Sequence, residues 1–392
     1  LDALDKICDK KSISAYIGFD CTANSLHVGS LLQIMILKLM QKHGHQPIVL
    51  LGGGTTLIGD PSGKDATRKI LDPNEINNNI QSIKKVFNKI LDTCKKKTKP
   101  VFVDNALWLT KLNYINFLRD IGSHFTINKM LTFDSVKLRL EREQSLSYME
   151  FNYMILQAYD FYQLFKTKNC ILQIGGSDQW GNIVNGVDLI RRKLQKESFG
   201  LTSPLITLAS GAKMGKTEKG AIWLNEELLS PYEYWQFWRN TDDRDVKRFL
   251  SYFTEIELNE INNICDKEKN INNLKIILAN EATKILHGEI ASKKAEKTAK
   301  ETFEGSGLGA DLPEIKLKLN EINKGINLLD FLSKNKIMTS KSEARRTIIN
   351  KGLKINNEVA NDANKILQLK DFKENILKIS YGKKRHYLIK II

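Results

Sequence analysis

The chain has 392 residues and a net charge of +15, with 42% hydrophobic and 27% charged side chains. This length exceeds what one compact core usually takes, so we expect a globular protein of two or three domains. The five cysteines are scattered without a CxxC pair, which excludes a disulfide framework and a zinc cluster and indicates a reducing compartment. No segment approaches the apolar length of a membrane span, so an integral membrane protein is excluded as well.

The first half of the chain alternates strand and helix signals. Short apolar runs predict strands over Ser14–Phe19, Pro47–Leu51 and Cys170–Ile174. Helices are predicted over Ser30–Lys42, capped by its own first residue, and over Ile183–Gln195. Strand–helix–strand units of this length predict an α/β fold with a doubly wound, Rossmann-like parallel sheet.

The second half loses the strand signal until its end. Residues from Asn225 to about Glu304 have a helical pattern, and Gly305–Pro313 is a small-residue linker that ends in proline. Beyond the linker we predict a helix over Ser340–Asn350 and short strands that complete a compact α+β domain. The expected domains are therefore an α/β domain, an α-helical domain and a small basic domain, over residues 1–224, 225–312 and 313–392.

The positive charge is concentrated in the last of these domains. From Glu314 to Ile392 there are 18 Lys and Arg against 8 Asp and Glu, so this tail carries +10 and the rest of the chain +5. A basic surface favours a polyanion partner, because bound phosphates release their counterions. A codon bias toward lysine is the alternative, but it would raise lysine everywhere.

Two glycine–lysine segments superficially resemble a phosphate-binding P-loop. In Gly211–Lys216 and Gly59–Lys64 the glycines stand four positions apart, where a P-loop needs five. The chain after Gly211 also leads to Ile222-Trp223-Leu224 and not to a clear helix. The P-loop interpretation is therefore rejected.

A better phosphate site is predicted from His27-Val28-Gly29-Ser30 together with Lys213-Met214-Gly215-Lys216-Thr217. The first segment lies between a strand and a helix, where backbone N–H groups and the helix dipole favour a phosphate. Gly29 lets a flat base approach the backbone, and His27 can donate to a phosphate oxygen. The two lysines of the second segment suit neutralisation of a departing pyrophosphate.

A helix predicted over Tyr148–Phe165 carries three polar side chains on one face. Tyr153, Gln157 and Asp160 occupy positions i, i+4 and i+7 among largely apolar neighbours. A buried polar group without a partner costs roughly 1–3 kcal/mol, so this face is expected to bind a polar ligand. A solvent-facing stripe is the alternative.

The first predicted strand carries a second polar set. Tyr16, Gly18 and Asp20 alternate with apolar residues and therefore share one face of the strand. We expect a phenol and a carboxylate to face a ligand above the sheet. A surface tyrosine on an edge strand is the alternative.

Six ordered segments carry a further signal: Tyr16–Asp20, His27–Ser30, Gly52–Gly63, Tyr153–Asp160, Gln173–Trp180 and Lys213–Thr217. Together they resemble the bacterial-type tyrosyl-tRNA synthetase family, which belongs to the class I aminoacyl-tRNA synthetases. The resemblance implies an enzyme that activates L-tyrosine with ATP to tyrosyl-adenylate plus pyrophosphate and then loads its tRNA. It also implies ATP as substrate, Mg²⁺ with the polyphosphate, and no metal site of the protein's own.

The resemblance carries residue roles over to matching positions. The catalytic set would be His27, Ser30, Lys64, Arg68, Lys213, Lys216 and Thr217. The tyrosine site would be Tyr16, Asp60, Tyr153, Gln157, Asp160, Gln173 and Gln179. The ATP site would be Gly18, Asp20, His27, Gly29, Gly176, Asp178 and Lys216. At the phenol end, Asp160 would accept the substrate's proton and Tyr16 would donate in return.

The chain departs from the family pattern at two positions. Ser30 stands where members often carry His and reaches less far, which puts its catalytic share in question. Gly215 stands where they often carry Ser, which implies a more flexible loop and no contact role for this residue.

The remaining segments resemble further parts of the family. The tail is similar to a small RNA-binding module shared with a small-subunit ribosomal protein, and Arg345, Arg346 and Lys354 are the implied phosphate contacts. Solvated helix charges are the alternative for each. Residues 225–312 would bind the anticodon, and the segment near 105–149 resembles the connection that forms the family's homodimer.

The implied partners are ATP, L-tyrosine, the tRNA for tyrosine and a second copy of the chain, with no membrane. A bacterial cytoplasm is expected, with an organellar matrix as the alternative. Three other functions stay open at this point: a synthetase for tryptophan, another adenylate-forming ligase, and an RNA-binding or splicing protein derived from a synthetase.

Overall fold

The computed structural model describes residues 2–60, 71–94, 97–217, 220–303, 312–323, 325–373, 375–382 and 385–392, with the backbone alone at 216–217 and 302–303. It contains two compact units. The first unit is Leu1–Leu229 with Thr241–Leu274, and the second is Ser230–Asn240 with Lys275–Ile392. Most of the predicted linker lies outside the described residues, and the predicted boundaries of three domains stay a prediction.

The first unit is built on a five-stranded parallel sheet with the strand order β3-β2-β1-β4-β5. Its strands are β1 (Ser14–Asp20), β2 (Gln46–Gly52), β3 (Val101–Asp104), β4 (Cys170–Gly176) and β5 (Phe199–Ser203). The order reverses between β1 and β4, so the ends of these two strands splay apart and open a crevice. The predicted doubly wound sheet is thereby confirmed.

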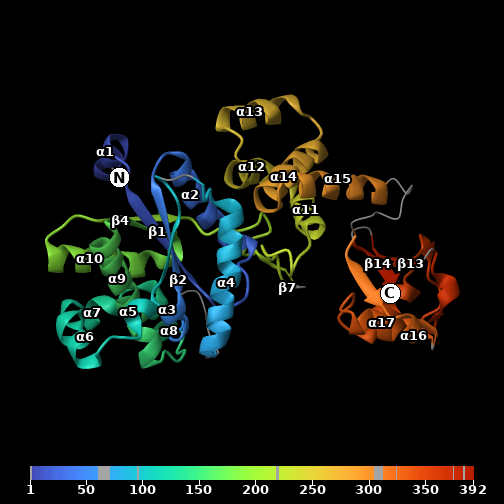
Figure 1. Ribbon diagram of the computed structural model, residues 1–392, viewed down its shortest axis with the longest axis horizontal. Helices are drawn as coiled ribbons and strands as arrows, with labels where there is room; N and C mark the ends of the chain where they lie inside the picture. The colour runs from blue at the N-terminus through green and yellow to red at the C-terminus, as the bar shows by residue number, and fades with distance from the viewer. Residues whose placement is uncertain are drawn as a thin grey trace. The chain divides into compact units, whose positions relative to one another are not determined.

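Helices cover both faces of this sheet (Figure 1). Their bounds are α1 (Asp2–Lys10), α2 (Leu31–Lys42), α3 (Gly53–Thr56), α4 (Pro73–Ile90), α9 (Tyr148–Lys168) and α10 (Trp180–Leu194). The long helix α9 starts in a capping box, because Ser147 accepts from the Glu150 N–H while the Glu150 carboxylate accepts from the Ser147 N–H. This cap fixes the start of the helix that carries the predicted polar face.

The start of α2 differs from the prediction. Ser30 occupies the N-cap position, but its side chain makes no capping hydrogen bond. The reason is that a 3-10 turn, Val28–Ser30, leads straight into the helix, so Ser30 already has helical backbone angles and its N–H bonds to the His27 carbonyl at 2.8 Å. The Ser30 hydroxyl is therefore not committed to a cap.

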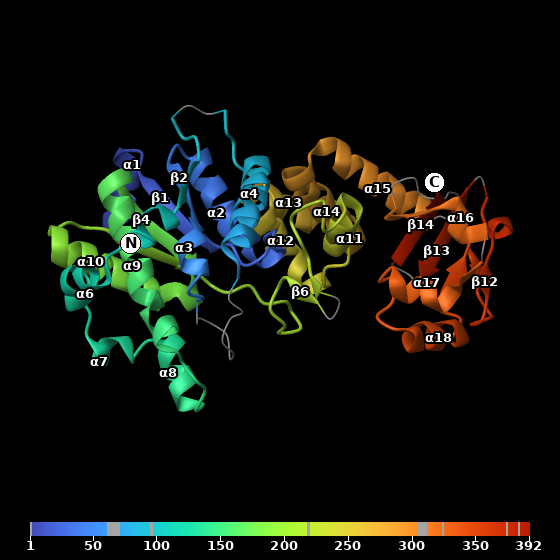
Figure 2. The same cartoon turned by 60° about the horizontal axis from the view of Figure 1, so that its bottom comes forward.

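Four short helices stand between β3 and α9, at one end of the first unit (Figure 2). They are α5 (Ala106–Leu109), α6 (Tyr114–Asp120), α7 (Ile127–Met130) and α8 (Asp134–Glu141). Arg139 of α8 forms a buried ion pair with Glu150 at 3.0 Å and also donates to the Ser145 carbonyl. This pair joins the short helices to the start of α9.

The chain after β5 forms the small hairpin β6 (Lys216–Thr217) and β7 (Gly220–Ala221), which agrees with the rejection of a P-loop helix there. Two further helices of the first unit are α12 (Val246–Phe253) and α13 (Leu258–Lys267). In the second unit, α11 (Pro231–Arg239) packs against α15 (Glu289–Phe303). Most of α14 (Ile271–His287) also belongs to this unit, which resumes at Lys275. Thus 225–303 is helical, as predicted.

The tail forms a separate core around a second sheet, with the strand order β11-β10-β13-β14-β8. The strands are β8 (Glu314–Leu317), β10 (Leu353–Ile355), β11 (Glu358–Val359), β13 (Ile376–Tyr381) and β14 (Arg385–Ile391), with the short pair β9 (Ile326–Asn327) and β12 (Ile366–Leu367) beside them. The helices are α16 (Leu319–Asn323), α17 (Leu328–Lys334) and α18 (Lys341–Ile349).

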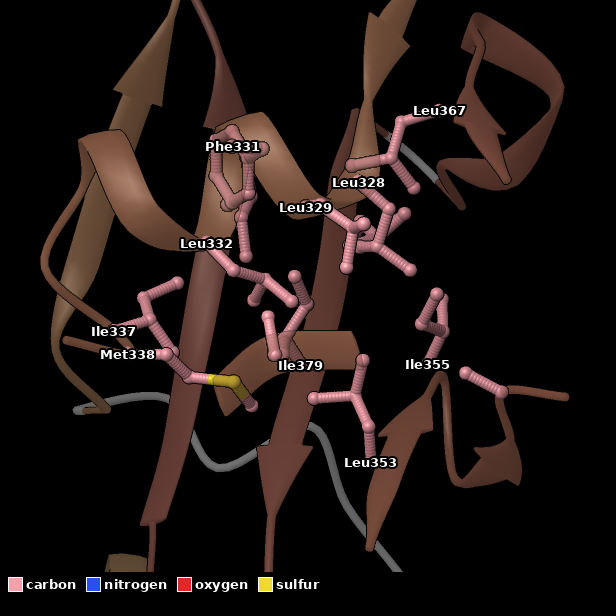
Figure 3. Packing of buried hydrophobic residues seen from close by; sticks show 14 of the residues in the cluster. Leu328, Leu329, Phe331, Leu332, Ile337, Met338, Leu353, Ile355, Leu367 and Ile379 are labelled. Carbon is pink, nitrogen blue, oxygen red and sulfur yellow. The ribbon is translucent and has the colours of Figure 1, made fainter. Parts of the chain in front are cut away.

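Apolar side chains from α17, β10 and β13 meet in the interior of this tail (Figure 3). Leu332 and Ile379 are fully buried there. The helix predicted over 340–350 and the strands near Lys354 and Tyr387 are all present. The tail is therefore a compact α+β domain, as its pattern indicated.

The buried pair between Arg139 and Glu150 provides a stability test. We expect Arg139→Ala to lower the free energy of unfolding by about 3–5 kcal/mol, because the change leaves the Glu150 carboxylate buried without its cation. Lys137→Ala in the same helix is the matched control, since its pair with Glu141 is exposed and should contribute less than about 1 kcal/mol. Urea titrations of the full chain measure both changes. Equal small effects would show that the buried pair is not needed for stability.

Candidate active site

A cavity of about 280 Å³ opens at the carboxyl ends of β1 and β4, where the strand order reverses. Residues from β1, β4, α2 and α9 contribute to its wall. Thirteen of the predicted site residues line it: Tyr16, Gly18, Asp20, Gly29, Ser30, Asp60, Tyr153, Gln157, Asp160, Gln173, Gly176, Asp178 and Gln179. The predicted polar faces of the first strand and of α9 therefore meet at one cavity.

Asp160 is the most buried carboxyl group of this wall, with 1% of its surface exposed. Its Oδ2 accepts a hydrogen bond from Asn105 Nδ2 at 2.9 Å, and its Oδ1 accepts from Trp108 Nε1 at 2.7 Å. Burial raises the pKa of Asp160 to about 7, although these two donors oppose the rise by stabilising the charged form. The group can therefore gain or lose a proton near neutral pH.

Tyr16 reaches the same cavity from β1. Its ring packs against Phe161 of α9, with 5.4 Å between the ring centres. Its hydroxyl is buried, and among the described residues it has no hydrogen-bond partner. Burial first, and the charge of Asp160 second, raise the pKa of Tyr16 well above its ordinary value, so it stays a neutral donor. An unpartnered phenol beside a carboxyl group is suited to bind a ligand hydroxyl.

A chain of hydrogen bonds leads from Asp160 to the other side of the cavity. Asn105 Nδ2 donates to Asp160 and, at 3.0 Å, to Thr55 Oγ1. Thr55 Oγ1 in turn donates to Asp20 Oδ1 at 2.8 Å, and the Tyr153 hydroxyl donates to Asp20 Oδ2 at 3.2 Å. The ends of β1 and β3, the α3 turn and α9 are thus joined by polar contacts.

A third polar group lies at the end of β4. Gln179 Nε2 donates to Asp60 Oδ2 at 3.0 Å and lies 3.3 Å from Asp178 Oδ2, while its Oε1 accepts from Asn182 at 2.9 Å. Gln173 of β4 is buried, and within the described ranges its Oε1 has no hydrogen-bond partner. These groups offer several acceptors to a cationic or hydroxylated ligand.

The two glycine-containing signature segments lie against each other. A Cβ placed on Gly215 would come within 2.6 Å of His27 Nδ1, and one placed on Gly29 would come within 2.7 Å of the Met214 carbonyl oxygen. Gly215 also has a φ of +98°, which favours glycine. The expectation that Gly215 has no contact role in the reaction stays a prediction, but its backbone packs directly on the first segment.

Several predicted residues lie outside the cavity wall. His27 does not line it; its Nδ1 accepts from the Gly29 N–H at 3.0 Å. Lys213 is exposed. Lys64 and Arg68 fall outside the described residues, as do the side chains of Lys216 and Thr217.

Three polar wall residues were not predicted from the sequence: Gln33, Thr55 and Asn105. Neither was Trp108, which contacts Asp160 without lining the cavity. Asn105 directly follows β3, and polar residues at the carboxyl end of a parallel strand are a recognisable signal. Thr55 lies in the glycine-rich segment that was recognised as a motif. No sequence pattern singles out Gln33 or Trp108.

Outside the cavity, the three predicted RNA contacts of the tail, Arg345, Arg346 and Lys354, are all exposed.

No group of three or more His, Cys, Asp or Glu side chains could hold a metal ion within the part of the chain that the structure describes. Nor does that part contain a helix of the length and apolar character that a membrane crossing requires.

Comparisons with known proteins match both ends of the chain. Residues 9–304 match the family of tRNA synthetases class I (W and Y), and residues 306–389 match the tyrosine–tRNA ligase SYY-like C-terminal domain. A solved structure, a C-terminally truncated mitochondrial tyrosyl-tRNA synthetase of Aspergillus nidulans, is 29% identical with a TM-score of 0.68, over 77% of this chain and 89% of that one.

Curated relatives match over nearly their whole length. The tyrosine–tRNA ligase of Pelagibacter ubique is 60% identical over 389 residues, 99% of this chain and 95% of the relative. That of Rickettsia massiliae is 52% identical over 395 residues, covering 100% of this chain and 96% of the relative. The chain therefore belongs to the tyrosine–tRNA ligases, within the class I tRNA synthetases.

Proposed function

We propose that this chain activates L-tyrosine with ATP, forming tyrosyl-adenylate and pyrophosphate, and then transfers the tyrosyl group to the 3′-terminal adenosine of its tRNA. The observation that carries the proposal is the pair at the phenol end of the cavity. Asp160 and Tyr16 are both buried there, and the Tyr16 hydroxyl has no partner among the described residues. A tyrosine hydroxyl would donate to Asp160 and accept from Tyr16.

This pair also accounts for selectivity. Phenylalanine would fill the same space but leave the buried Tyr16 hydroxyl without a partner, which costs roughly 1–3 kcal/mol, and it would offer no donor to Asp160 beyond Asn105 and Trp108. Tryptophan would place an indole N–H, which cannot accept, opposite the Tyr16 donor. These two arguments favour tyrosine over the tryptophan alternative.

The other polar groups have proposed roles along the substrates. Tyr153, Asp60 and Gln157 would bind the tyrosine ammonium, with Gln173 behind them and Gln179 near the reacting carboxylate. Asp178 would hold the ATP ribose, and Gly18, Asp20, Gly29 and Gly176 would line the nucleotide. The support is that these residues share one cavity wall with the phenol-binding pair.

Adenylate formation needs no covalent bond to the protein. The tyrosine carboxylate attacks the α-phosphorus of ATP, and the α–β phosphoanhydride bond breaks to release pyrophosphate. Catalysis is then alignment plus hydrogen-bond donors directed at charge that develops in the transition state. The proposed donors are His27, Ser30, Lys64, Arg68, Lys213, Lys216 and Thr217.

Magnesium would arrive with the phosphates of ATP and not in a protein cage. The described residues offer no cluster of three metal-ligating side chains, and a hard cation of this kind is commonly held by substrate phosphates plus water. The metal is thus proposed as part of the ATP substrate.

We propose a homodimer formed through the segment near 105–149. Its short helices expose the large apolar side chains of Leu107 (61%), Ile115 (67%) and Ile127 (58%), and Tyr148 at the start of α9 is also exposed (66%). An exposed apolar group of this extent is typical of an interface.

A bacterial cytoplasm is the proposed location, supported by the bacterial origin of the curated relatives.

The function is tested by exchange of label between pyrophosphate and ATP, driven by each amino acid in turn. We expect exchange with tyrosine, and we expect Asp160→Ala to reduce it more than about 100-fold while tRNA binding is retained, because the change removes the acceptor for the phenol. Asp266→Ala, which removes an exposed carboxylate from α13, is the control. Exchange driven by another amino acid, or by none, would refute the assignment.

The pH dependence of tyrosine use follows from Asp160. Its pKa of about 7 in the free enzyme means that the carboxylate gains a proton as the pH falls below this value. The kcat/KM for tyrosine should then fall about tenfold for each further pH unit, because the neutral acid no longer accepts from the phenol.

The same enzyme supplies the control for this pH profile. With saturating tyrosine, the phenol hydrogen bond stabilises the ionised form of Asp160 and lowers its pKa. The kcat/KM for ATP should therefore stay level over the same range. Parallel decline of both profiles would assign the titration to another group.

The basic tail is tested by salt-dependent tRNA binding. We expect Arg345→Ala to weaken tRNA binding and to lower the slope of log affinity against log salt concentration by about one, because one phosphate contact is lost. Lys373→Ala removes the same charge from another exposed position of the tail and should leave that slope nearly unchanged. Identical slopes for all three proteins would remove Arg345 from the tRNA contact surface.

A further inference from the structure

A buried carboxylate at the start of α12 holds the chain that leads into the Lys213–Thr217 loop. Only 3% of Asp245 is exposed, and its Oδ2 accepts a hydrogen bond from the Ala209 N–H at 2.8 Å. Its Oδ1 accepts from Arg248 Nη2 at 2.5 Å, and the same nitrogen donates to the Thr207 carbonyl at 2.6 Å. The two side chains thus hydrogen-bond to two backbone groups of one short segment, the Ala209 N–H and the Thr207 carbonyl.

The segment that they hold, residues 207–213, is a tight turn. The Gly211 N–H donates to the Leu208 carbonyl at 2.8 Å, and the Leu208 N–H donates to the Ala212 carbonyl at 2.8 Å. Thr207 and Lys213 face each other as a β-bridge across this turn. The position of the Thr207 backbone therefore fixes the position of the Lys213 backbone, where the Lys213–Thr217 loop begins.

The loop beyond the turn has little freedom of its own. The Met214 N–H bonds to the Ile206 carbonyl at 3.1 Å, and Gly215 packs against His27 and Gly29 without room for a Cβ. The Ile222 N–H bonds back to the Gly215 carbonyl, and the Val28 N–H bonds to the Ile222 carbonyl at 2.9 Å. A shift of the turn would therefore move the loop against the first signature segment.

The same helix also packs against the helix that follows the first signature segment. α12 packs against α2, whose N-terminal end follows directly on His27–Ser30. Lys38 and Lys42 of α2 form ion pairs with Glu255 and Glu257, which follow α12, at 3.5 and 2.7 Å. α12 is thus linked to the turn that precedes the second signature segment and to the helix that follows the first.

We propose that Asp245 and Arg248 are positioning residues for adenylate formation. They set the base of the Lys213–Thr217 loop, and through it the placement of the loop against His27, without touching a substrate. The inference rests on the proposed function, because it assigns the loop to the release of pyrophosphate. Their effect falls on the rate of adenylate formation and not on tyrosine binding, which uses the other end of the cavity.

The test uses four variants of the full chain: Asp245→Ala, Arg248→Ala, Arg248→Lys and Arg244→Ala. Arg244 is the matched control, since it pairs with Asp242 on an exposed turn next to α12 and, within the described residues, forms no hydrogen bond or ion pair with the 207–213 turn. We measure the single-turnover rate of adenylate formation, the equilibrium dissociation constant for tyrosine without ATP, and the thermal unfolding midpoint.

The expected result is a split between rate and binding. Asp245→Ala and Arg248→Ala should each form adenylate at least about tenfold more slowly, which corresponds to loss of roughly one charge-assisted hydrogen bond. The tyrosine dissociation constant should stay within about twofold of the parent value. Arg248→Lys should recover most of the rate, because lysine can still donate to Asp245 or Thr207, and Arg244→Ala should match the parent.

Two outcomes would overturn the inference. One is an unchanged adenylation rate in both alanine variants. The other is an equal loss of rate and of tyrosine affinity together with a lower unfolding midpoint, which would make the pair a structural support only. If Asp245→Ala does not fold, Arg248→Ala decides, because 38% of the Arg248 side chain is exposed and its loss spares the core. Absence of tyrosine-dependent adenylation in the parent protein would instead refute the proposed function.

Discussion

The site depends on keeping one carboxylate, Asp160, inside the protein. Burial opposes its charge, and the nearby carboxylates Asp20 and Asp104 add to that opposition. Two N–H donors, from Asn105 and Trp108, compensate by stabilising the charged form. Since these donors come from the end of β3 and from α5, the carboxylate keeps its state only when α9, the sheet and the first inserted helix are assembled together. Recognition at the cavity is thus a property of the whole first unit.

Crowding of acidic groups also explains the glycine run after β2. A Cβ on Gly52 would come within 2.4 Å of Asp20 Oδ1, and one on Gly53 within 2.3 Å of Asp104 Oδ1. The side chains of both carboxylates occupy the space that any larger residue would need. The absence of side chains at Gly52 and Gly53 therefore leaves space for the carboxylates of Asp20 and Asp104. Thr55, the first residue with a hydroxyl after these glycines, donates to Asp20.

The sequence predicts much of this arrangement, because its signals are local. Alternation in β1 and the seven-residue spacing in α9 place Tyr16 and Asp160 on definite faces, and a parallel sheet brings strand ends to one edge. Strand alternation and helical spacing do not show which residues, distant in sequence, contact each other. Trp108 lies in a four-residue helix without a pattern of its own, and the hydrogen bond of its indole to Asp160 arises only when the insertion folds back. The capping role expected of Ser30 was wrong for a related reason, since the preceding 3-10 turn changes its backbone angles.

The two signature segments are a second example of a contact between residues that are distant in sequence. His27–Ser30 and Lys213–Thr217 are separated by most of the first unit in sequence, yet each contributes a glycine to their contact, and neither glycine leaves room for a Cβ. Because the contact is backbone against backbone, it is set by whatever holds the two backbones, namely α2 on one side and the Thr207–Lys213 turn on the other. The placement of the two segments against each other is then determined by packing outside the cavity, so the motif residues identify the family but do not by themselves specify their alignment.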